Sequence, residues 1–275
     1  MATTPPSRRG ISGPGQLLFA LTMVGLGVTG FTQHGFSPIW DPIPKWAPEH
    51  ALIPYVVAAV SLVCGLGLLF RGTAALAARI LLAALLVSLL AFRLRNAVLT
   101  PTTVVYWENV AEATVYVAGA WALYASVGVE WDRRLGFAVG DNGLRIARAL
   151  FGLAMIAFGF AHLAYLGYTA VLVPKWIQRH DAWALVTGWA YILSGVAVLT
   201  SVAARLAATL ATLQILGFTL LVWAPQVYAG SKDPSVWSET LVSWTLTVSA
   251  WVVAETYRGG RWLGEGPMKA QPPKR

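Results

Sequence analysis

The chain has 275 residues, of which 57% are hydrophobic and only 12% are charged, and its formal net charge is +8. A soluble domain with this composition would have too few charged residues to cover its surface, so an ordinary soluble fold is excluded. The single cysteine, Cys64, excludes a disulfide framework and a CxxC redox pair within the chain. The composition therefore predicts an all-α membrane protein with several transmembrane helices.

Apolar runs long enough to cross a bilayer recur along the whole chain. Residues 1–15 are rich in Pro, Ser and Gly and are predicted to form a flexible tail. Eight transmembrane helices are predicted over residues 16–34, 51–70, 73–94, 106–127, 145–165, 183–201, 203–226 and 236–257. A polar linker over 128–144 separates the first four helices from the last four, and a basic tail over 258–275 follows. No small-residue cleavage site follows the first apolar run, which is therefore interpreted as a retained helix.

The two halves of the chain share one sequence register. A shift of 130 residues superimposes identical residues in five places, namely Pro44 on Pro174, Trp46 on Trp176, His50 on His180, Gly65 on Gly195 and Trp107 on Trp237. The chain is therefore predicted to be a duplicated four-helix unit, with repeats over 16–127 and 145–257. Because four helices return the chain to the side on which it started, the repeats are predicted to be parallel, which disfavours an inverted-repeat transporter.

Basic residues are distributed unequally between the two sides of the predicted helices. The richer side holds Arg8, Arg9, Arg71, Arg79, Arg133, Arg134, Arg145, Arg148, Arg205, Arg258, Arg261, Lys269, Lys274 and Arg275, and the other side holds Lys45, Arg93, Arg95, Lys175, Arg179 and Lys232. The positive-inside rule then predicts a bacterial inner-membrane protein with both termini in the cytoplasm. The basic tail belongs to this asymmetry, so the lipid bilayer is a predicted partner and nucleic acid is not.

All four histidines, His34, His50, His162 and His180, are predicted on the outer, periplasmic side, two in each half. Together with the Pro-Lys-Trp segments, which contain Trp46 and Trp176, they form a candidate cofactor site. Such a set could hydrogen-bond a quinone, bind a transition metal or supply axial ligands to a haem. No HxH or HExxH spacing supports a metal, so metal and haem are the weaker predictions. The alternative is that each histidine caps a helix end and that each tryptophan anchors the chain at the interface.

Acidic residues gather where the fourth and eighth predicted helices begin. Glu108 and Glu112 are one helical turn apart and share a face, and Glu239 opens the eighth helix. Arg93 and Arg95 are the predicted counter-charges, at a depth near the interface that water reaches. Ionisable groups in transmembrane segments are functional candidates, and both a proton path and a structural ion-pair network stay open. The first half carries these charges, so it is the better candidate if only one half is active.

Three glycines in the first predicted helix, Gly25, Gly27 and Gly30, match the spacing of a dinucleotide-binding fingerprint. They lie inside a transmembrane segment with no strand before it, whereas the fingerprint requires a strand–turn–helix unit. Close helix packing is therefore the predicted role of these glycines.

The second half contains motifs that resemble the DoxX-like family of integral membrane proteins. The matching segments are Gly159-Phe160-Ala161-His162, Val173-Pro174-Lys175-Trp176, and the helix with Trp183, Gly188 and Gly195. The first half matches more loosely, through Gly30 to His34 and Pro44-Lys45-Trp46. The resemblance implies a four-helix bundle and an association with a quinone-linked membrane oxidoreductase, without a set of catalytic residues. Relatives that act on thiols use cysteine pairs, which this chain lacks.

Three functions are open from the sequence, and whether the chain is an enzyme is open too. The first is an accessory or quinone-interacting subunit of a membrane redox system, with its functional face toward the periplasm. In it, His34 and His162 contact the quinone, while Glu108 and Glu112 lie near a proton path. The second is a non-enzymatic structural or assembly subunit that binds other subunits of a larger membrane complex. A small-solute transporter is least favoured, because few polar residues are predicted near the membrane centre.

Overall fold

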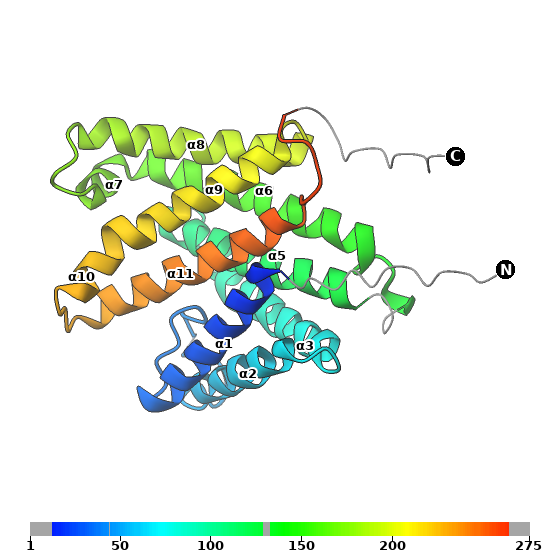
Figure 1. The fold of residues 1–275 in the computed structure, drawn as a ribbon. Helices are drawn as coiled ribbons and strands as arrows, with labels where there is room; N and C mark the ends of the chain where they lie inside the picture. The colour runs from blue at the N-terminus through cyan, green and yellow to red at the C-terminus, as the bar shows by residue number, and fades with distance from the viewer. Residues whose placement is uncertain (1–12, 44, 129–132, 264–275) are drawn as a thin grey trace, which may run out of the picture.

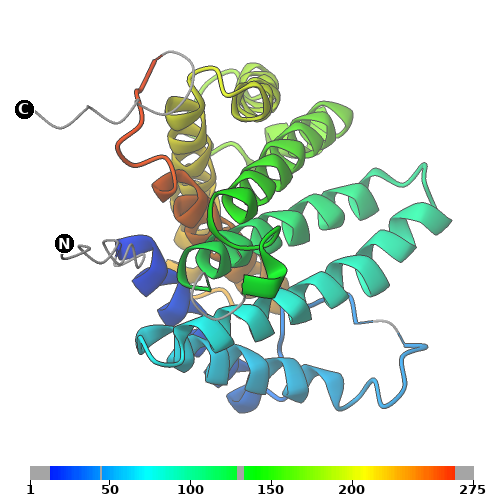
Figure 2. The same cartoon turned by 90° about the vertical axis from the view of Figure 1, so that its right-hand side faces the viewer.

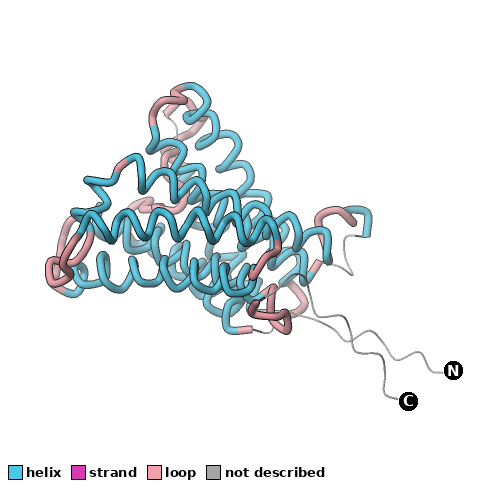
Figure 3. The backbone as a smooth tube through the Cα atoms, turned by 90° about the horizontal axis from the view of Figure 1, so that it is seen from above, coloured by secondary structure: helices cyan, strands magenta, loops and turns pink. Residues whose placement is uncertain are grey.

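The computed structural model describes residues 13–43, 45–128 and 133–263. Over these residues the chain forms helices joined by turns and loops, without a β-strand (Figure 1 and Figure 3). The predicted all-α class is therefore confirmed. Pro44, most of both predicted tails and residues 129–132 of the predicted linker lie outside the described residues.

Both halves of the chain are built from helical segments that follow closely on one another. The first half contains α1 (Pro14–Thr32), α2 (Ile53–Leu69), α3 (Ala74–Val87), the π-helical segment η1 (Ser88–Arg93), α4 (Leu94–Leu99) and α5 (Val104–Val127). The second half contains the 3-10 helix η2 (Arg133–Leu135), α6 (Gly140–Ala164), α7 (Leu166–Leu172), α8 (His180–Thr200), α9 (Ala204–Phe218), the π-helical segment η3 (Thr219–Trp223), α10 (Ala224–Tyr228) and α11 (Pro234–Glu255). The segments α3, η1 and α4 form one continuous helix, as do α9, η3 and α10.

Six of the described helices are long and apolar enough to cross a membrane, judged by length and composition. They are Pro14–Thr32, Ala74–Leu99, Val104–Val127, Gly140–Ala164, His180–Thr200 and Ala204–Tyr228. Of the other two predicted spans, α2 is apolar but has 17 residues. Helix α11 has 22 residues, but it is rich in Ser and Thr and carries Glu239. Six such helices are consistent with the predicted multi-pass membrane protein.

Proline and aspartate residues fix where several helices begin. Pro14 and Pro234 occupy the first positions of α1 and α11, where a missing N–H costs no intrahelical hydrogen bond. Asp233 caps α11 through its Oδ1 atom, which accepts from the Ser235 N–H at 2.9 Å and from the Ser235 hydroxyl at 2.8 Å. These two hydrogen bonds to the charged carboxylate lower the pKa of Asp233. The sequence thus sets the start of α11 locally.

Glycines allow α1 and α2 to pack in backbone contact. A methyl group on Gly27 would lie 2.6 Å from the Leu62 backbone nitrogen and 2.7 Å from the Ala58 carbonyl oxygen. A methyl group on Gly65 of α2 would lie 2.7 Å from the Val24 backbone nitrogen. A real Cβ atom does not approach backbone atoms so closely, so only glycine fits at both positions. The predicted packing role is therefore confirmed for Gly27 and for Gly30, where a methyl group would lie 2.6 Å from the Ala58 Cβ atom, and it is wrong for Gly25, where a methyl group meets nothing within 4 Å.

Element bounds and side-chain contacts recur between the halves at the 130-residue shift. The shift carries the start of α3, at Ala74, onto the start of α9, at Ala204, and the end of η1 onto the end of η3. The indole N–H of Trp107 donates to the Pro101 carbonyl at 3.0 Å, and that of Trp237 donates to the Ser231 carbonyl at the same distance. These tryptophans therefore brace equivalent turns, one before α5 and one before α11.

The halves meet mainly along α5, which packs against α6 and α11 of the second half, and α1 also packs against α11. In Figure 2 the blue and cyan helices of the first half lie below the green to orange helices of the second half. Gly119 of α5 lies against Ser249 of α11, so close that a methyl group there would be 2.9 Å from the Ser249 Cα atom. Gly119 and Ser249 are equivalent in the 130-residue register. The two central helices therefore cross at equivalent points.

Contacts across the bundle define two ends of the molecule. At the basic end, the Gly15 N–H of α1 donates to Glu255 of α11 at 3.1 Å, and Arg148 near the start of α6 donates to Thr256 at 2.9 Å. The opposite end, which we call the histidine end, contains the connection between α1 and α2 and the connection between α6 and α8. Helices α7 and α10 mark the histidine end at the left of Figure 1.

The two connections at the histidine end differ in structure. The first connection, residues 33–52, folds onto the bundle, where Trp40 is 3% exposed and donates its indole N–H to the Ser61 hydroxyl at 3.1 Å. The second connection, residues 165–179, contains α7 and leaves Trp176 74% exposed. The tryptophans of the two motifs, Trp46 and Trp176, are both exposed, at 54% and 74%, so the connections differ in the presence of α7 and not in the burial of the motif.

Candidate functional site

A buried arginine organises the histidine end of the first half. Arg93, the last residue of η1, is 2% exposed. One terminal nitrogen of its guanidinium donates to the Ile39 carbonyl of the first connection at 2.7 Å. The other terminal nitrogen donates to the Asn109 carbonyl at 2.8 Å and pairs with the Glu112 carboxylate at 3.3 Å. The predicted pairing of Arg93 with the acidic start of the next helix is therefore confirmed.

Arg93 is buried far more completely than the sequence predicts. The expected position was near a water-accessible interface, but the first connection covers the guanidinium through Ile39, which is itself 1% exposed. Asp41 of the same connection interacts with the Arg93 charge. Partial burial raises the pKa of Asp41, and the nearby guanidinium opposes that rise. The predicted access of water to Arg93 is wrong, because sequence periodicity does not show how a loop folds back onto a bundle.

The second predicted counter-charge, Arg95, has another role. It is exposed, and its guanidinium carbon lies 4.8 Å from the ring centroid of Trp46. Trp46 also makes an edge-to-face contact with Phe92 at 6.2 Å between ring centroids. Arg95 therefore fastens the first connection through a cation–π contact and does not neutralise the glutamates.

Tyr116 extends the buried group by one further helical turn along α5. Its ring centroid is 6.0 Å from the guanidinium carbon of Arg93, and its side chain is fully buried. Its hydroxyl group, the Nε atom of Arg93 and the hydroxyl of Ser88 make no hydrogen bond within the described chain. Because buried polar atoms are almost always satisfied in native proteins, each of these three atoms is a candidate for a hydrogen bond to a bound water or to a polar ligand group.

Three carboxyl groups lie near Arg93 and Tyr116. Glu108 and Glu112 lie one turn apart on α5, and Glu239 lies near the start of α11. Each of the three is close enough to another for their charges to interact. Glutamates from both halves therefore meet at the histidine end, where they can bind and release protons.

A tyrosine on α8 connects these carboxyl groups to one histidine. Tyr191 is 4% exposed and lies close enough to Glu108 of α5 and Gln214 of α9 for both side chains to influence it. The ring of His162 lies edge-to-face on Tyr191, with 5.2 Å between centroids, and on Phe218, with 5.6 Å. Its Nδ1 atom is 3.0 Å from the Phe158 carbonyl oxygen. We call Arg93, Glu108, Glu112, Tyr116, Tyr191, Glu239 and His162 the polar cluster.

The other predicted cofactor residues lie apart from the polar cluster. His34 and His50 are exposed, and His180 begins α8 in a partly exposed position. None of these three histidine side chains makes a hydrogen bond, ion pair or ring contact with a described residue, and Trp46 and Trp176 are 54% and 74% exposed. No three His, Cys, Asp or Glu side chains of the described residues are placed to hold a metal ion. The predicted four-histidine site is therefore not assembled.

The register explains why the histidines do not act as a symmetric set. His162 lies within the last turn of α6, but the equivalent residue of α1 is Thr32. His34 follows the end of α1 in a left-handed conformation with a φ of 52°. Of the four histidines, His162 is therefore the one turned into the described bundle.

Two residues of the polar cluster were missed from the sequence, although one had a visible signal. Tyr116 follows Glu112 by four residues, as Glu112 follows Glu108, so all three share one face of α5. Tyr191 has no such pattern, because its partners come from α6 and α9. Periodicity could find the first tyrosine but not the second.

Comparisons of the chain with protein-family models, with curated proteins and with solved structures gave no match. The resemblance to the DoxX-like family stays a prediction from the residue motifs.

Proposed function

We propose that the chain is a DoxX-like inner-membrane protein built from two parallel four-helix units, eight transmembrane helices in all, with both termini in the cytoplasm. The equivalent bounds of α3 and α9 and the matching Trp107 and Trp237 hydrogen bonds support this architecture. The concentration of arginines at the basic end supports the orientation. The histidine end, with the polar cluster, then faces the periplasm.

Within this architecture, the polar cluster binds the headgroup of a quinone, and the chain serves as an accessory subunit of a membrane redox system. The observation that carries this proposal is the buried Arg93 beside Glu112, with the unpaired hydroxyl of Tyr116 next to it. A quinone carbonyl needs hydrogen-bond donors, which the guanidinium and the phenol provide. An arginine is always charged, so it also stabilises the negative charge that develops on a carbonyl oxygen during reduction.

The carboxyl groups complete the chemistry of such a site. Reduction of a quinone to a quinol takes up two electrons and two protons. A separate redox subunit supplies the electrons, and Glu108, Glu112 and Glu239 relay the protons. His162 lies beside Tyr191 at the second-half side of the same cluster and can exchange a proton with water.

Replacing Tyr116 with phenylalanine tests this assignment. The variant should weaken binding of a short-chain benzoquinone by about 2- to 10-fold, the value of one hydrogen bond, while leaving thermal stability unchanged. Stability should not fall because the hydroxyl has no partner within the described chain. Equilibrium binding and a thermal unfolding curve, both on detergent-purified protein, measure the two quantities.

The matched control is His34→Ala, which removes an exposed histidine outside the polar cluster and should leave quinone binding unchanged. Wild-type protein that binds no quinone, or a Tyr116→Phe variant that binds it as the wild type does, would overturn the quinone proposal. A larger loss of quinone affinity in His34→Ala than in Tyr116→Phe would indicate that the exposed histidines, and not the polar cluster, form the quinone site.

The exposed surface of the second connection favours a second candidate function, that of an assembly subunit. Tyr168 and Val171 of α7 are each 81% exposed, and Trp176 beside them is 74% exposed. Aromatic residues of this kind are enriched at protein interfaces and at the membrane–water boundary. Co-purification of a larger complex that is lost when Tyr168 and Trp176 are both changed to Ser would support this function.

A further inference from the structure

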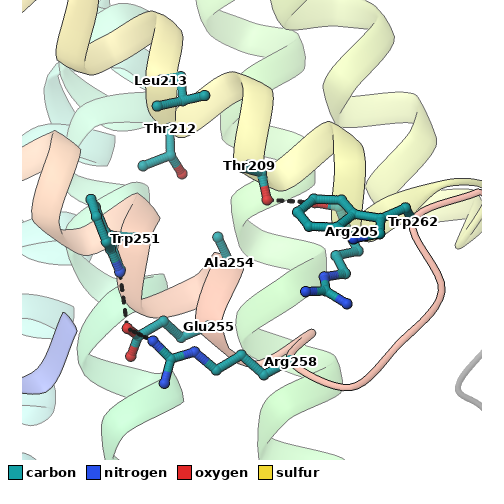
Figure 4. A pocket seen from close by; sticks show the side chains of 9 residues that line it. All are labelled: Arg205, Thr209, Thr212, Leu213, Trp251, Ala254, Glu255, Arg258 and Trp262. Atoms are coloured by element: carbon teal, nitrogen blue, oxygen red, sulfur yellow. Dashed lines mark hydrogen bonds and ion pairs between the residues drawn. The ribbon is translucent and has the colours of Figure 1, made fainter. Parts of the chain in front are cut away.

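A cavity of about 200 Å³ lies between α9 and α11 at the basic end, far from the polar cluster. Figure 4 shows the side chains that line it. Helix α9 contributes Arg205, Thr209 and Leu213, which are spaced four residues apart and form one stripe. Helix α11 contributes Trp251 and Ala254, and Arg258 follows the helix end on the same stripe. Each wall therefore has a guanidinium at the basic end and apolar groups further in.

Both guanidinium groups keep donors that can reach an anion. Arg205 donates one hydrogen bond to the Gly260 carbonyl at 2.7 Å and stacks on Trp262, with 4.0 Å between its guanidinium carbon and the ring centroid. Arg258 is 57% exposed at its side chain and pairs with Glu255 at 2.7 Å. A guanidinium has five N–H donors, so one contact to a neighbour leaves several for a phosphate.

The acidic lining residue of the cavity, Glu255, is hydrogen-bonded through one of its two carboxylate oxygens, and its Oε2 atom is buried without a partner in the described chain. The Oε1 atom of Glu255 accepts hydrogen bonds from the Gly15 N–H at 3.1 Å, the Trp251 indole at 2.9 Å and the Arg258 guanidinium. The Glu255 side chain is only 6% exposed. The ionised side chains that line the cavity, Arg205, Arg258 and Glu255, therefore carry a net charge of +1.

The segment after α11 holds this arrangement in place. Arg148 of α6 donates to the hydroxyl and to the carbonyl of Thr256, and its guanidinium carbon lies 4.1 Å from the ring centroid of Tyr257. These contacts fasten the chain that leads to Gly260 and Trp262, the two residues that orient Arg205. The arginine on α9 is thus positioned before any ligand binds.

We propose that this cavity binds an anionic phospholipid, with its phosphate between Arg205 and Arg258 and an acyl chain along Ala254 and Leu213. The eight helical steps from Arg205 to Leu213 span about 12 Å, enough for a ligand to extend from the charged boundary into the hydrocarbon region. Basic pockets between helices at a membrane boundary are suited to anionic headgroups. A free phosphate would use the arginines but not the apolar walls.

The first half lacks this pair of arginines. In the 130-residue register, Ala75 takes the place of Arg205 and Gly128 takes the place of Arg258. The two guanidinium groups are therefore not a requirement of the helical framework, and they mark a binding property of the second half.

Lipid retention by purified protein tests the proposal. The double variant Arg205→Gln/Arg258→Gln should bind phosphatidylglycerol about five- to thirty-fold more weakly than the wild type, as measured by native mass spectrometry in detergent. The control Arg71→Gln/Arg145→Gln removes the same charge from two exposed arginines that do not line the cavity. It should bind phosphatidylglycerol as the wild type does.

Four further outcomes decide the proposal. The variant Leu213→Trp keeps both arginines but fills the space beside the apolar wall, so it should also reduce phosphatidylglycerol binding. This variant tests the proposal even if the double variant does not fold. Equal loss in the two double variants would overturn the proposal, because the effect would then be general surface charge. Binding of phosphatidylcholine as tight as phosphatidylglycerol, or displacement of phosphatidylglycerol by millimolar inorganic phosphate, would overturn it as well.

Discussion

Replacing Arg93 with methionine is expected to destabilise the protein by about 3–5 kcal/mol, the usual cost of removing one partner from a buried ion pair. The variant leaves the Glu112 carboxylate without its counter-charge in a buried position. It also removes the donors to the Ile39 and Asn109 carbonyls, so the first connection loses its attachment to the bundle. Because methionine is also a long, unbranched side chain, the loss of stability should come mainly from the missing charge and hydrogen bonds and less from a cavity.

The measurement is unfolding by a denaturing detergent, followed by tryptophan fluorescence. The matched control is Arg95→Met, which removes the same charge two residues away from an exposed cation–π contact and should cost about 1 kcal/mol or less. Replacing both members of the pair, in Arg93→Met/Glu112→Leu, should cost less than the sum of the single changes, because no buried charge is left alone. Equal stability of Arg93→Met and Arg95→Met would show that the buried pair does not hold the first connection.

The sequence predicted the members of this pair but not its surroundings. Helical spacing places Glu108 and Glu112 on one face, and an arginine at the end of the preceding helix is the natural counter-charge. The covering carbonyl of Ile39 comes from a proline-rich connection, whose path follows no periodic rule. Local patterns therefore identified the ion pair, while its burial depended on contacts between segments distant in the chain.

For the histidines, the sequence predicted a shared site that the contacts of the structure do not form. The sequence places all four near one end of the molecule, and the two connections there share the Pro-Lys-Trp motif. Proximity to one end does not bring side chains together, however, because each must also point inward. His162 does so from the inner face of α6, whereas His34 lies beyond the end of α1 in a left-handed turn. Side-chain direction at helix ends is the property that composition and spacing could not supply.

Helix α11 is not among the helices apolar enough to cross a membrane, although the sequence predicts a transmembrane span over 236–257. It contains Ser243, Thr245, Thr247 and Ser249 at buried positions. The hydroxyl groups of Thr247 and Ser249 donate hydrogen bonds to carbonyl groups of α11 itself. The Ser243 hydroxyl is hydrogen-bonded to the Thr219 hydroxyl of η3 at 2.7 Å. A helix at the centre of the bundle can be polar because its neighbours, and not lipid, surround it.

Replacing Gly27 with alanine is expected to destabilise the protein by about 1–3 kcal/mol, the usual cost of overpacking a tight contact. The added methyl group would lie against the backbone of Leu62 and Ala58, and backbone atoms cannot rotate away as a flexible side chain can. Helices α1 and α2 would therefore have to separate along their length. Unfolding by a denaturing detergent, followed by tryptophan fluorescence, measures this loss of stability.

The matched control lies two residues earlier in the same helix. A methyl group on Gly25 meets nothing within 4 Å, so Gly25→Ala should leave stability unchanged or raise it by up to about 1 kcal/mol through helix propensity. Comparable losses in both variants would mean that α1 needs glycine for a reason other than contact with α2. A loss in Gly27→Ala alone would show that sequence spacing in this helix encodes the distance between two backbones, which in turn positions the first connection over Arg93.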